Sequence, residues 1–350
     1  MHILVVKKSS VIALCNGILF EFDNDMNIVK SGDKLFSFFF GKFNILAKLF
    51  RKVIYSIKKI SNENYIISSG NGLHRLNISD LSLKKIKTPD NFKKCLNIGV
   101  VNIDGCLNIL YSNYNANLNK DEISVYLAPI NSLDDYKLVY RFDKNKINHI
   151  HSFYQDPATK DIFFNVGDQC EHVGIWKLCS KTFEAKPYLT GLQDYRAVFC
   201  WIDNSKYFFA TDFPGGNNYL KCINILDANP NIKIIDSING PVIYGTETDE
   251  FVYFATSAEP KKNLGLSAYI PILPIFQKSY LYEFDKKSSK VRCIASAKKD
   301  WLNPYLFGFG SFQFPCIEDN AKLHVNRIGI KQINASDKFS SFSSYNVYEL

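Results

Sequence analysis

A recurring unit of four short apolar runs constrains this 350-residue sequence more strongly than any other feature. In the second half of the chain the unit is marked by the runs DIFFNVGD, KYFFATD and FVYFATSAE, each with an apolar run before it and another after it. The acidic residues Asp168, Asp212 and Glu259 end these runs and are 44 and 47 residues apart. Four strands within about 40–50 residues are the repeat of a β-propeller blade.

The first half of the chain carries the same pattern. SSVIALCNGILFEFDNDMNIVKS and NENYIISSGNGLHRLNISDLSLKKI both read as strand, Asn-Gly turn, strand, polar turn and strand. The pairs Asn16-Gly17 and Asn71-Gly72 favour a two-residue hairpin, because both central residues of that turn need positive φ. We therefore predict an all-β fold, with residues 1–350 forming a single β-propeller of seven four-stranded blades. Six or eight blades are the alternatives, because insertions blur the count.

The two ends of the chain are expected to close the ring. The N-terminal run ILVVKK would complete the last blade by pairing with the C-terminal NVYEL, which removes the strand edge that an open array of blades would expose. A pair of β-sandwiches and a parallel β-helix are the competing folds. A sandwich does not predict an internal repeat, and a β-helix repeats about every 20 residues.

Composition narrows the class of protein and its setting. The net charge is +8, but no long basic run is interleaved with aromatic residues, so we predict no nucleic-acid partner. The nine cysteines are an odd number without paired CxxC spacing, which favours free thiols in a reducing compartment. MHILVVKKSS has its lysines after the apolar residues, the reverse of a secretory signal, and no apolar run reaches 18 residues. We predict a cytoplasmic protein, which would be peripheral to the inner face of the membrane if the insertions described below attach to it.

Polar residues recur at the same two positions of successive repeats. In a propeller, the start of each innermost strand and the loop after the second strand lie at the same end of the central channel. Residues in these two positions are therefore expected to line one pocket at the channel mouth. They are Tyr114, Asn117, His149, His151, Asp168, Arg196, Asp212, Tyr244 and Glu259.

His149 and His151 are candidate ligands of a divalent metal, the one cofactor that the sequence suggests. Being two residues apart on a strand, they point to the same side of it. With Asp168, Glu171 or Asp212 they would form a mixed nitrogen and oxygen site. The alternative is that both histidines are hydrogen-bonded channel residues. The candidate substrate-binding residues are His149, His151, Tyr114, Asn117 and Tyr244.

Four charged residues are candidates for catalysis: Asp168, Arg196, Asp212 and Glu259. The planar fork of Arg196 could clamp a carboxylate or phosphate, or it could pair with Asp194 or Asp212. Paired carboxylates such as Asp212 and Glu259 could act as acid and base, or as nucleophile, on a glycosidic bond. Their alternative role is to cap turns, as aspartate does in a Thr-Asp-x-Pro turn.

Two stretches interrupt the repeat. In DKLFSFFFGKFNILAKLFRK, residues 33–52, apolar side chains step by three or four, which predicts an amphipathic helix near residues 34–52 with a basic polar face. LGLSAYIPILPIFQK, residues 264–278 of an insertion over 261–278, holds Pro271 and Pro274, which exclude a regular helix. Both stretches could pack on the propeller rim as a lid, or contact an anionic membrane surface or an apolar partner.

The run from His149 to about Phe314 carries further motifs: HIHSFYQDP, Gly167-Asp168, QDYRAV, a Thr-Asp-x-Pro turn, NGPVIYG, SAEP, and KDW followed by FGFGSFQFP. This half of the chain resembles uncharacterised bacterial β-propeller proteins that are themselves similar to sialidase-like (BNR-type) propellers. The resemblance implies a propeller and a setting in surface-polysaccharide metabolism. It does not extend to hydrolysis of sialic acid, since the sequence lacks a good S-x-D-x-G-x-x-W turn and places only Arg196 of the three arginines that a sialidase needs.

Three functions fit these features. The first is a carbohydrate-active enzyme that uses the charged residues above on a glycan or a sugar-containing small molecule. The second is a non-catalytic sugar-binding propeller with Tyr114, Tyr195 and Tyr244 as aromatic platforms. The third is a protein-interaction scaffold that works through its apolar insertions. We favour a carbohydrate-active or sugar-binding propeller of glycan metabolism, with the scaffold as the alternative, and the sequence does not decide whether a bond is broken.

Overall fold

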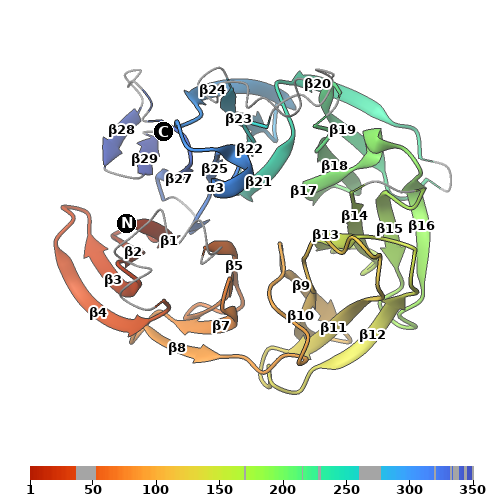
Figure 1. The fold of residues 1–350 in the computed structure, drawn as a ribbon, viewed down its shortest axis with the longest axis horizontal. Coiled ribbons are helices and arrows are strands. Elements are labelled where there is room, and N and C mark those ends of the chain that lie inside the picture. The colour runs from red at the N-terminus through yellow and green to blue at the C-terminus, as the bar shows by residue number, and fades with distance from the viewer. Residues whose placement is uncertain are drawn as a thin grey trace.

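The strands form a ring of β-sheets around a central axis, and the sheet that holds the first strand lies next to the sheet that holds the last strands where the ring closes (Figure 1). The computed structural model describes residues 1–36, 53–168, 171–214, 216–227, 230–259, 277–318, 321–331, 333, 339–342 and 345–348. Within these ranges the helices are short: the 3-10 helix η1 (Gln193–Tyr195) and the helix α3 (Pro304–Phe307). None of the described helices is long and apolar enough to cross a membrane.

Five of the sheets contain four strands in chain order, with the first strand nearest the axis. The first of these holds β5 (Ile54–Lys59), β6 (Asn64–Ser69), β7 (Gly72–Asn77) and β8 (Ser82–Lys85). The second holds β9 (Gly99–Ile103), β10 (Cys106–Ser112), β11 (Ile123–Pro129) and β12 (Lys137–Phe142). The third holds β13 (His149–Gln155), β14 (Ile162–Gly167), β15 (Gly174–Leu178) and β16 (Ala185–Thr190). The fourth holds β17 (Ala197–Asp203), β18 (Lys206–Thr211), β19 (Asn218–Asn224) and β20 (Lys233–Ile238). The fifth holds β21 (Val242–Glu247), β22 (Phe251–Thr256), β23 (Lys278–Asp285) and β24 (Lys290–Lys298).

Two further sheets lie where the ring closes. One has the order β25-β27-β29-β28 and holds β25 (Ser311–Gln313), β27 (Leu323–Ile328), β28 (Phe339–Phe342) and β29 (Tyr345–Tyr348). The other has the order β26-β1-β2-β3-β4 and holds β1 (His2–Val6), β2 (Ser10–Cys15), β3 (Ile18–Asp23), β4 (Ile28–Lys34) and β26 (Cys316–Ile317). The prediction of an all-β propeller with four-stranded blades is confirmed. The blades are not the seven uniform four-stranded units that the sequence predicted, because six described sheets have four strands and one has five.

The ring does not close by the strand exchange that the sequence suggested. The C-terminal strand β29 pairs with β27 and β28, whereas β1 pairs with β2 and, in parallel, with the two-residue strand β26. The last sheet reaches β1 through a side chain instead. The backbone N–H of Ile3 donates to Oδ1 of Asn326 at 2.8 Å, and Nδ2 of Asn326 donates to the carbonyl of Ile3 at 2.8 Å. One buried amide therefore satisfies both polar groups of a strand residue, as a partner strand would.

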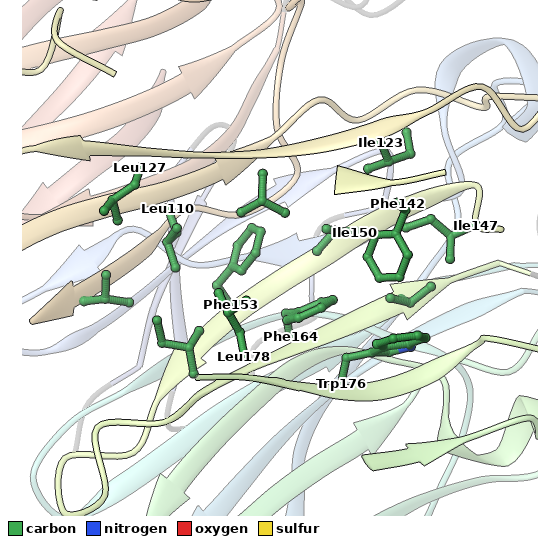
Figure 2. Close-up of a cluster of buried hydrophobic side chains, with 14 residues drawn as sticks. Leu110, Ile123, Leu127, Phe142, Ile147, Ile150, Phe153, Phe164, Trp176 and Leu178 are labelled. Carbon is green, nitrogen blue, oxygen red and sulfur yellow. The ribbon is translucent and has the colours of Figure 1, made fainter. Parts of the chain in front are cut away.

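The core consists of apolar layers between neighbouring sheets. In the cluster of Figure 2, Leu110 and Leu127 of one sheet pack against Phe153 and Phe164 of the next. Second strands such as β14 are buried along their whole length, whereas outer strands such as β12 are mostly exposed. A strand buried on both faces must be apolar on both sides, which explains the continuous apolar runs of the sequence.

An irregularity in three of the innermost strands, β5, β13 and β21, turns one residue of each toward the axis. The pairing of first and second strands shifts register between Ile54 and Ser56 in β5, between Ile150 and Ser152 in β13, and between Val242 and Tyr244 in β21. A β-bulge of this kind redirects the side chain that it leaves unpaired. The bulged residues Tyr55, His151 and Ile243 all line the cavity described below.

The two predicted insertions lie mainly outside the described residues. The amphipathic helix predicted near 34–52 falls on residues 37–52, and the segment 261–278 falls largely on 260–276, neither of which the structure describes. At their edges, Lys34 ends β4, Leu35 and Phe36 are buried, and Lys278 begins β23. The membrane contacts proposed for 34–52 and 264–278 therefore stay predictions.

Replacing Asn326 tests the closure of the ring. Asn326→Ala leaves the buried N–H and C=O of Ile3 without these two partners, so we expect the free energy of unfolding to fall by about 2–3 kcal/mol. Denaturant unfolding measures this change. Asn91→Ala, at an exposed position, serves as the control and should stay within about 0.5 kcal/mol of the parent. Equal effects of the two substitutions would show that the amide does not hold the ends of the ring together.

Candidate functional site

A cavity of about 500 Å³ lies at one end of the central channel. Its walls come from the starts of innermost strands and from the loops that follow second strands, the two positions that the repeat predicted. Of the nine residues named from the sequence, the cavity brings together Tyr114, His149, His151, Asp168, Arg196, Asp212, Tyr244 and Glu259. The arrangement therefore joins polar groups from several sheets in one place.

Two of the three acidic residues named from the sequence directly follow the second strand of their sheet, and the third does not. Asp168 directly follows β14, and Asp212 directly follows β18. The residue that directly follows β22 is Ser257, so Glu259 lies two residues beyond the equivalent position. Ser257 is buried and lines the cavity, and its hydroxyl has no hydrogen-bond partner among the described residues. It offers a polar group to a bound molecule or to water.

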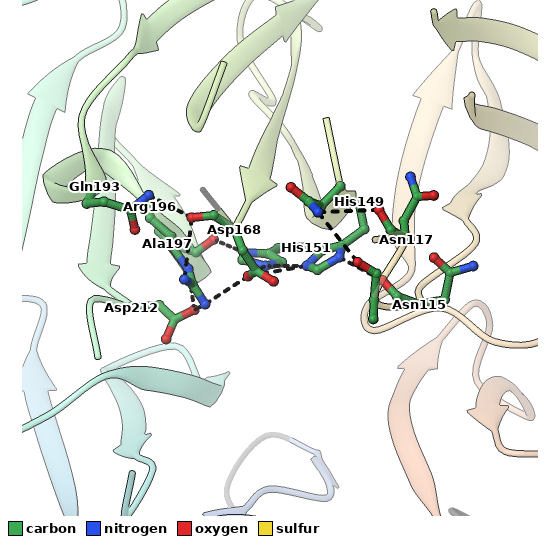
Figure 3. A network of polar contacts seen from close by, with 11 residues as sticks. Asn115, Asn117, His149, His151, Asp168, Gln193, Arg196, Ala197 and Asp212 are labelled. Carbon is green, nitrogen blue, oxygen red and sulfur yellow. Dashed lines mark hydrogen bonds and ion pairs between the residues drawn. The ribbon is translucent and has the colours of Figure 1, made fainter. Parts of the chain in front are cut away.

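His149 and His151 face each other on the cavity wall, and both are only 2% exposed (Figure 3). Nδ1 of His149 lies 2.9 Å from the carbonyl of Asn115, and Nδ1 of His151 lies 2.9 Å from the carbonyl of Ala197. A carbonyl can only accept, so each Nδ1 carries a hydrogen. The two Nε2 atoms are 3.0 Å apart, and both point toward Asp168.

The carboxylate of Asp168 completes a group of three acceptor atoms. Its Oδ1 lies 3.5 Å from Nε2 of His149 and 3.6 Å from Nε2 of His151. Burial lowers the pKa of His149, and His151 acts in the same direction, while Asp168 opposes both. Burial alone would raise the pKa of Asp168, but the two neighbouring histidines and the charge of Arg196 hold it well below its usual value. In their neutral form the rings therefore aim lone pairs at an ionised carboxylate.

Arg196 joins the neighbouring sheets through two carboxylates. Its Nη2 lies 2.9 Å from Oδ1 of Asp168 and 2.8 Å from Oδ2 of Asp212, and its Nε donates to the same Asp212 oxygen at 2.9 Å. Burial would lower the pKa of Arg196, but Asp212 and Asp168 raise it above its usual value. The predicted pairing with Asp212 is present, whereas Asp194 pairs with Lys221.

These ion pairs limit what the carboxylates can do chemically. A glycosidase of the common type needs one carboxylic acid that keeps its proton, at a raised pKa. The pKa of Asp168 moves in the opposite direction, and Asp212 is buried against Arg196. The geometry suits these two groups to fixing a cation or an arginine better than to donating a proton.

Tyrosine rings form another part of the wall. The ring of Tyr114 meets the ring of His149 edge to face, with centroids 4.5 Å apart. Nζ of Lys94 donates to the hydroxyl of Tyr55 at 2.7 Å and lies 4.4 Å from the centroid of the Tyr55 ring. Burial raises the pKa of Tyr244 to about 12, so its hydroxyl stays protonated. The wall therefore combines flat apolar surfaces with hydroxyl donors and a cation.

Two residues named from the sequence do not line the cavity. Asn117 has positive φ, and its side chain donates to the carbonyl of Asp121 at 3.0 Å and accepts from the N–H of Asp121 at 2.9 Å, so it shapes its own loop. Tyr195, predicted as a platform, lies in η1 outside the lining. A short local turn uses both ends of the Asn117 amide, which explains why Asn117 is not among the lining residues, and its predicted substrate-binding role stays a prediction.

Other residues of the site gave no usable signal in the sequence. Nε2 of Gln193 donates to the carbonyl of Asp168 at 2.7 Å. A Cβ on Gly167 would lie 2.2 Å from Nε2 of His151, so glycine makes room for that ring. The Gly-Asp pair was noticed as a motif, but only the fold shows what the glycine faces.

Comparisons with known proteins support the fold and no closer relationship. No protein-family model matches the chain, and no curated protein matches it. Solved structures that match include oligogalacturonate lyase in complex with manganese, with a TM-score of 0.52 and 9% identity over 87% of this chain and 82% of that chain. Oligogalacturonate lyase from Vibrio parahaemolyticus matches with a TM-score of 0.51 and 8% identity over 89% and 88% of the two chains. Puromycin hydrolase matches with a TM-score of 0.50 and 9% identity over 89% of this chain and 50% of that one.

At such identities these matches establish the fold alone. They support the propeller that the sequence resemblance implied. The sialidase-like (BNR-type) part of that resemblance has no support from a family model.

The contact between Gly167 and His151 can be tested by a double-mutant cycle. Gly167→Ala should displace the imidazole and lower the free energy of unfolding by about 1–3 kcal/mol. In a His151→Ala background the obstacle is gone, so the same change should cost less than about 0.5 kcal/mol. Denaturant unfolding of the four proteins gives the coupling. Equal costs in both backgrounds would contradict the packing of His151 on Gly167.

Proposed function

We propose that this protein is a carbohydrate-binding propeller of glycan metabolism and that its cavity takes an acidic saccharide. One observation carries the proposal: a single cavity combines tyrosine rings with charged and hydrogen-bonding groups that come from different sheets. Its volume of about 500 Å³ lies within the range of about 300–1,000 Å³ of small-molecule sites.

A sugar ring presents two kinds of surface, and the cavity has a counterpart for each. The C–H faces of a sugar are apolar and pack on aromatic rings, for which Tyr55, Tyr114 and Tyr244 provide candidates. The hydroxyl groups of a sugar both donate and accept hydrogen bonds. The hydroxyl of Ser257, buried in the lining without a described partner, can exchange either kind of bond with them.

The lining carries the three carboxylates of Asp168, Asp212 and Glu259, and the case for an acidic saccharide over a neutral one depends on the two cations beside them. Lys94 and Arg196 place two cations on the wall. Lys94, whose Nζ lies 4.4 Å from the centroid of the Tyr55 ring, is the candidate to attract a sugar carboxylate, while Arg196 binds two carboxylates of the protein. Two of the matched propellers are oligogalacturonate lyases, which is consistent with a sugar ligand here.

Binding of defined oligosaccharides tests the proposal. Isothermal titration with oligogalacturonides and with neutral oligosaccharides of the same length should show binding of the acidic series only. Tyr114→Ala should weaken that binding about 10-fold or more, since stacking of this kind contributes about 1 kcal/mol or more. Tyr140→Ala, on the outermost strand β12 of the same sheet, is the control and should bind as the parent does.

A second variant, at Lys94, removes the positive charge and keeps a side chain of similar length. Lys94→Met should lower the affinity for the acidic series about 10-fold and leave any weak binding of the neutral series unchanged. Failure of the folded protein to bind any acidic saccharide would refute the proposal and favour the alternative function of a protein-interaction scaffold.

A further inference from the structure

We infer that His149, His151 and Asp168 form a binding site for one divalent transition-metal ion of the series from Mn²⁺ to Zn²⁺. The inference deepens the proposed function and rests on it in one respect, namely that the ion would face the saccharide. The site itself stands on the geometry of the three side chains, which form a group of possible metal ligands among the described residues.

The direction of the lone pairs is the first argument. Both Nδ1 atoms are committed to backbone carbonyls as donors, so both Nε2 atoms of the neutral rings are acceptors. They lie 3.0 Å apart and point at a carboxylate oxygen, which is also an acceptor. Three acceptors that converge with no hydrogen between them repel each other unless a cation lies among them.

The distances between these atoms fit a metal ion. Separations of 3.0, 3.5 and 3.6 Å define a triangle whose corners lie on a circle with a radius of about 2.0 Å. Bonds from Zn²⁺ to imidazole nitrogen and carboxylate oxygen are about 2.0–2.2 Å long. An ion close to the plane of the three atoms would therefore bind all of them without movement of the side chains.

The second shell of a metal site is also in place. Metal-bound histidines commonly donate their other ring N–H to a carbonyl or carboxylate, which fixes the ring and its tautomer. His149 does so to Asn115 and His151 to Ala197. Arg196 holds the carboxylate of Asp168 from the side, and so the ligand atoms are fixed before any ion binds.

The placement of the group leaves room for a further ligand. The histidines are buried, whereas the side chain of Asp168 is 41% exposed, and all three line the cavity. Three protein ligands with an open position are typical of metal sites that bind a substrate or water. A carboxylate or hydroxyl pair of the proposed saccharide is the chemistry that would fill this position.

Metal titration without saccharide tests the site. The full-length protein, treated with chelator and dialysed, should bind one Mn²⁺ per chain by equilibrium dialysis or electron paramagnetic resonance. Zn²⁺ should displace it, because sites with nitrogen and oxygen ligands generally bind Zn²⁺ more tightly than Mn²⁺. His149→Ala and the isosteric Asp168→Asn should each weaken binding about 100-fold or more. His172→Ala removes an imidazole near the end of β14, outside the ligand group, and should bind Mn²⁺ as the parent does.

Far-UV circular dichroism and thermal unfolding establish that each variant is folded. If the folded parent binds neither Mn²⁺ nor Zn²⁺ at millimolar concentration, the site is refuted, and a proton shared by the two rings accounts for the 3.0 Å separation. Binding that survives both ligand substitutions refutes it as well. Metal binding without saccharide binding would overturn the proposed function alone, and saccharide binding that is insensitive to chelator would overturn the placement of the ion against the saccharide.

Discussion

Burial of both faces of each sheet is the constraint on which the rest of this structure depends. A sheet whose second strand is apolar on both sides needs a neighbour on each face, and a row of such sheets leaves two faces in water unless it closes. Trp201 is an example of packing between sheets. Its ring stacks on the ring of Phe208 in its own sheet, with centroids 4.9 Å apart, and its centroid lies 5.2 Å from that of Phe284 in the next sheet. Closure then brings the first strand of every complete blade to the axis, where Asn326 and β26 hold the end of the ring to β1.

The same closure explains why charged and polar groups gather at one end of the channel. Side chains near the axis cannot all pack on a neighbouring sheet, so polar residues there must find partners among themselves. Asp168 and Arg196 do so across a sheet boundary, at 2.9 Å, although they are far apart in the chain. A buried charge without a partner would cost several kcal/mol, so the cluster is stable only as a set. The positions of His149 and His151 are fixed as well, because Nδ1 of each ring donates a hydrogen bond to a backbone carbonyl. The carbonyl is that of Asn115 for His149 and that of Ala197 for His151.

The two proposals concern adjacent parts of one cavity. The tyrosines and Lys94 supply the surfaces on which a sugar acid would rest, and the histidine pair with Asp168 supplies a place for a cation beside it. Neither proposal requires a proton donor among the carboxylates, which agrees with the low pKa of Asp168. Of the two carboxylates considered from the sequence as an acid and base, Asp212 is buried in an ion pair with Arg196, and the catalytic role of Glu259 stays a prediction.

The repeat, the strands and the positions at which polar residues recur could be predicted from the sequence, because each depends on residues close together in the chain. That local information sufficed to place Asp168 and Asp212 in one cavity. Tertiary structure alone decided that Ser257, and not Glu259, occupies the next equivalent position, and that Asn117 serves its own loop. The tertiary structure also decided how the ring closes, because the contact between the Asn326 amide and Ile3, 323 residues away, is not part of the sequence repeat. Contacts of that kind depend on which surfaces meet after the sheets pack, and no spacing rule along the chain encodes them.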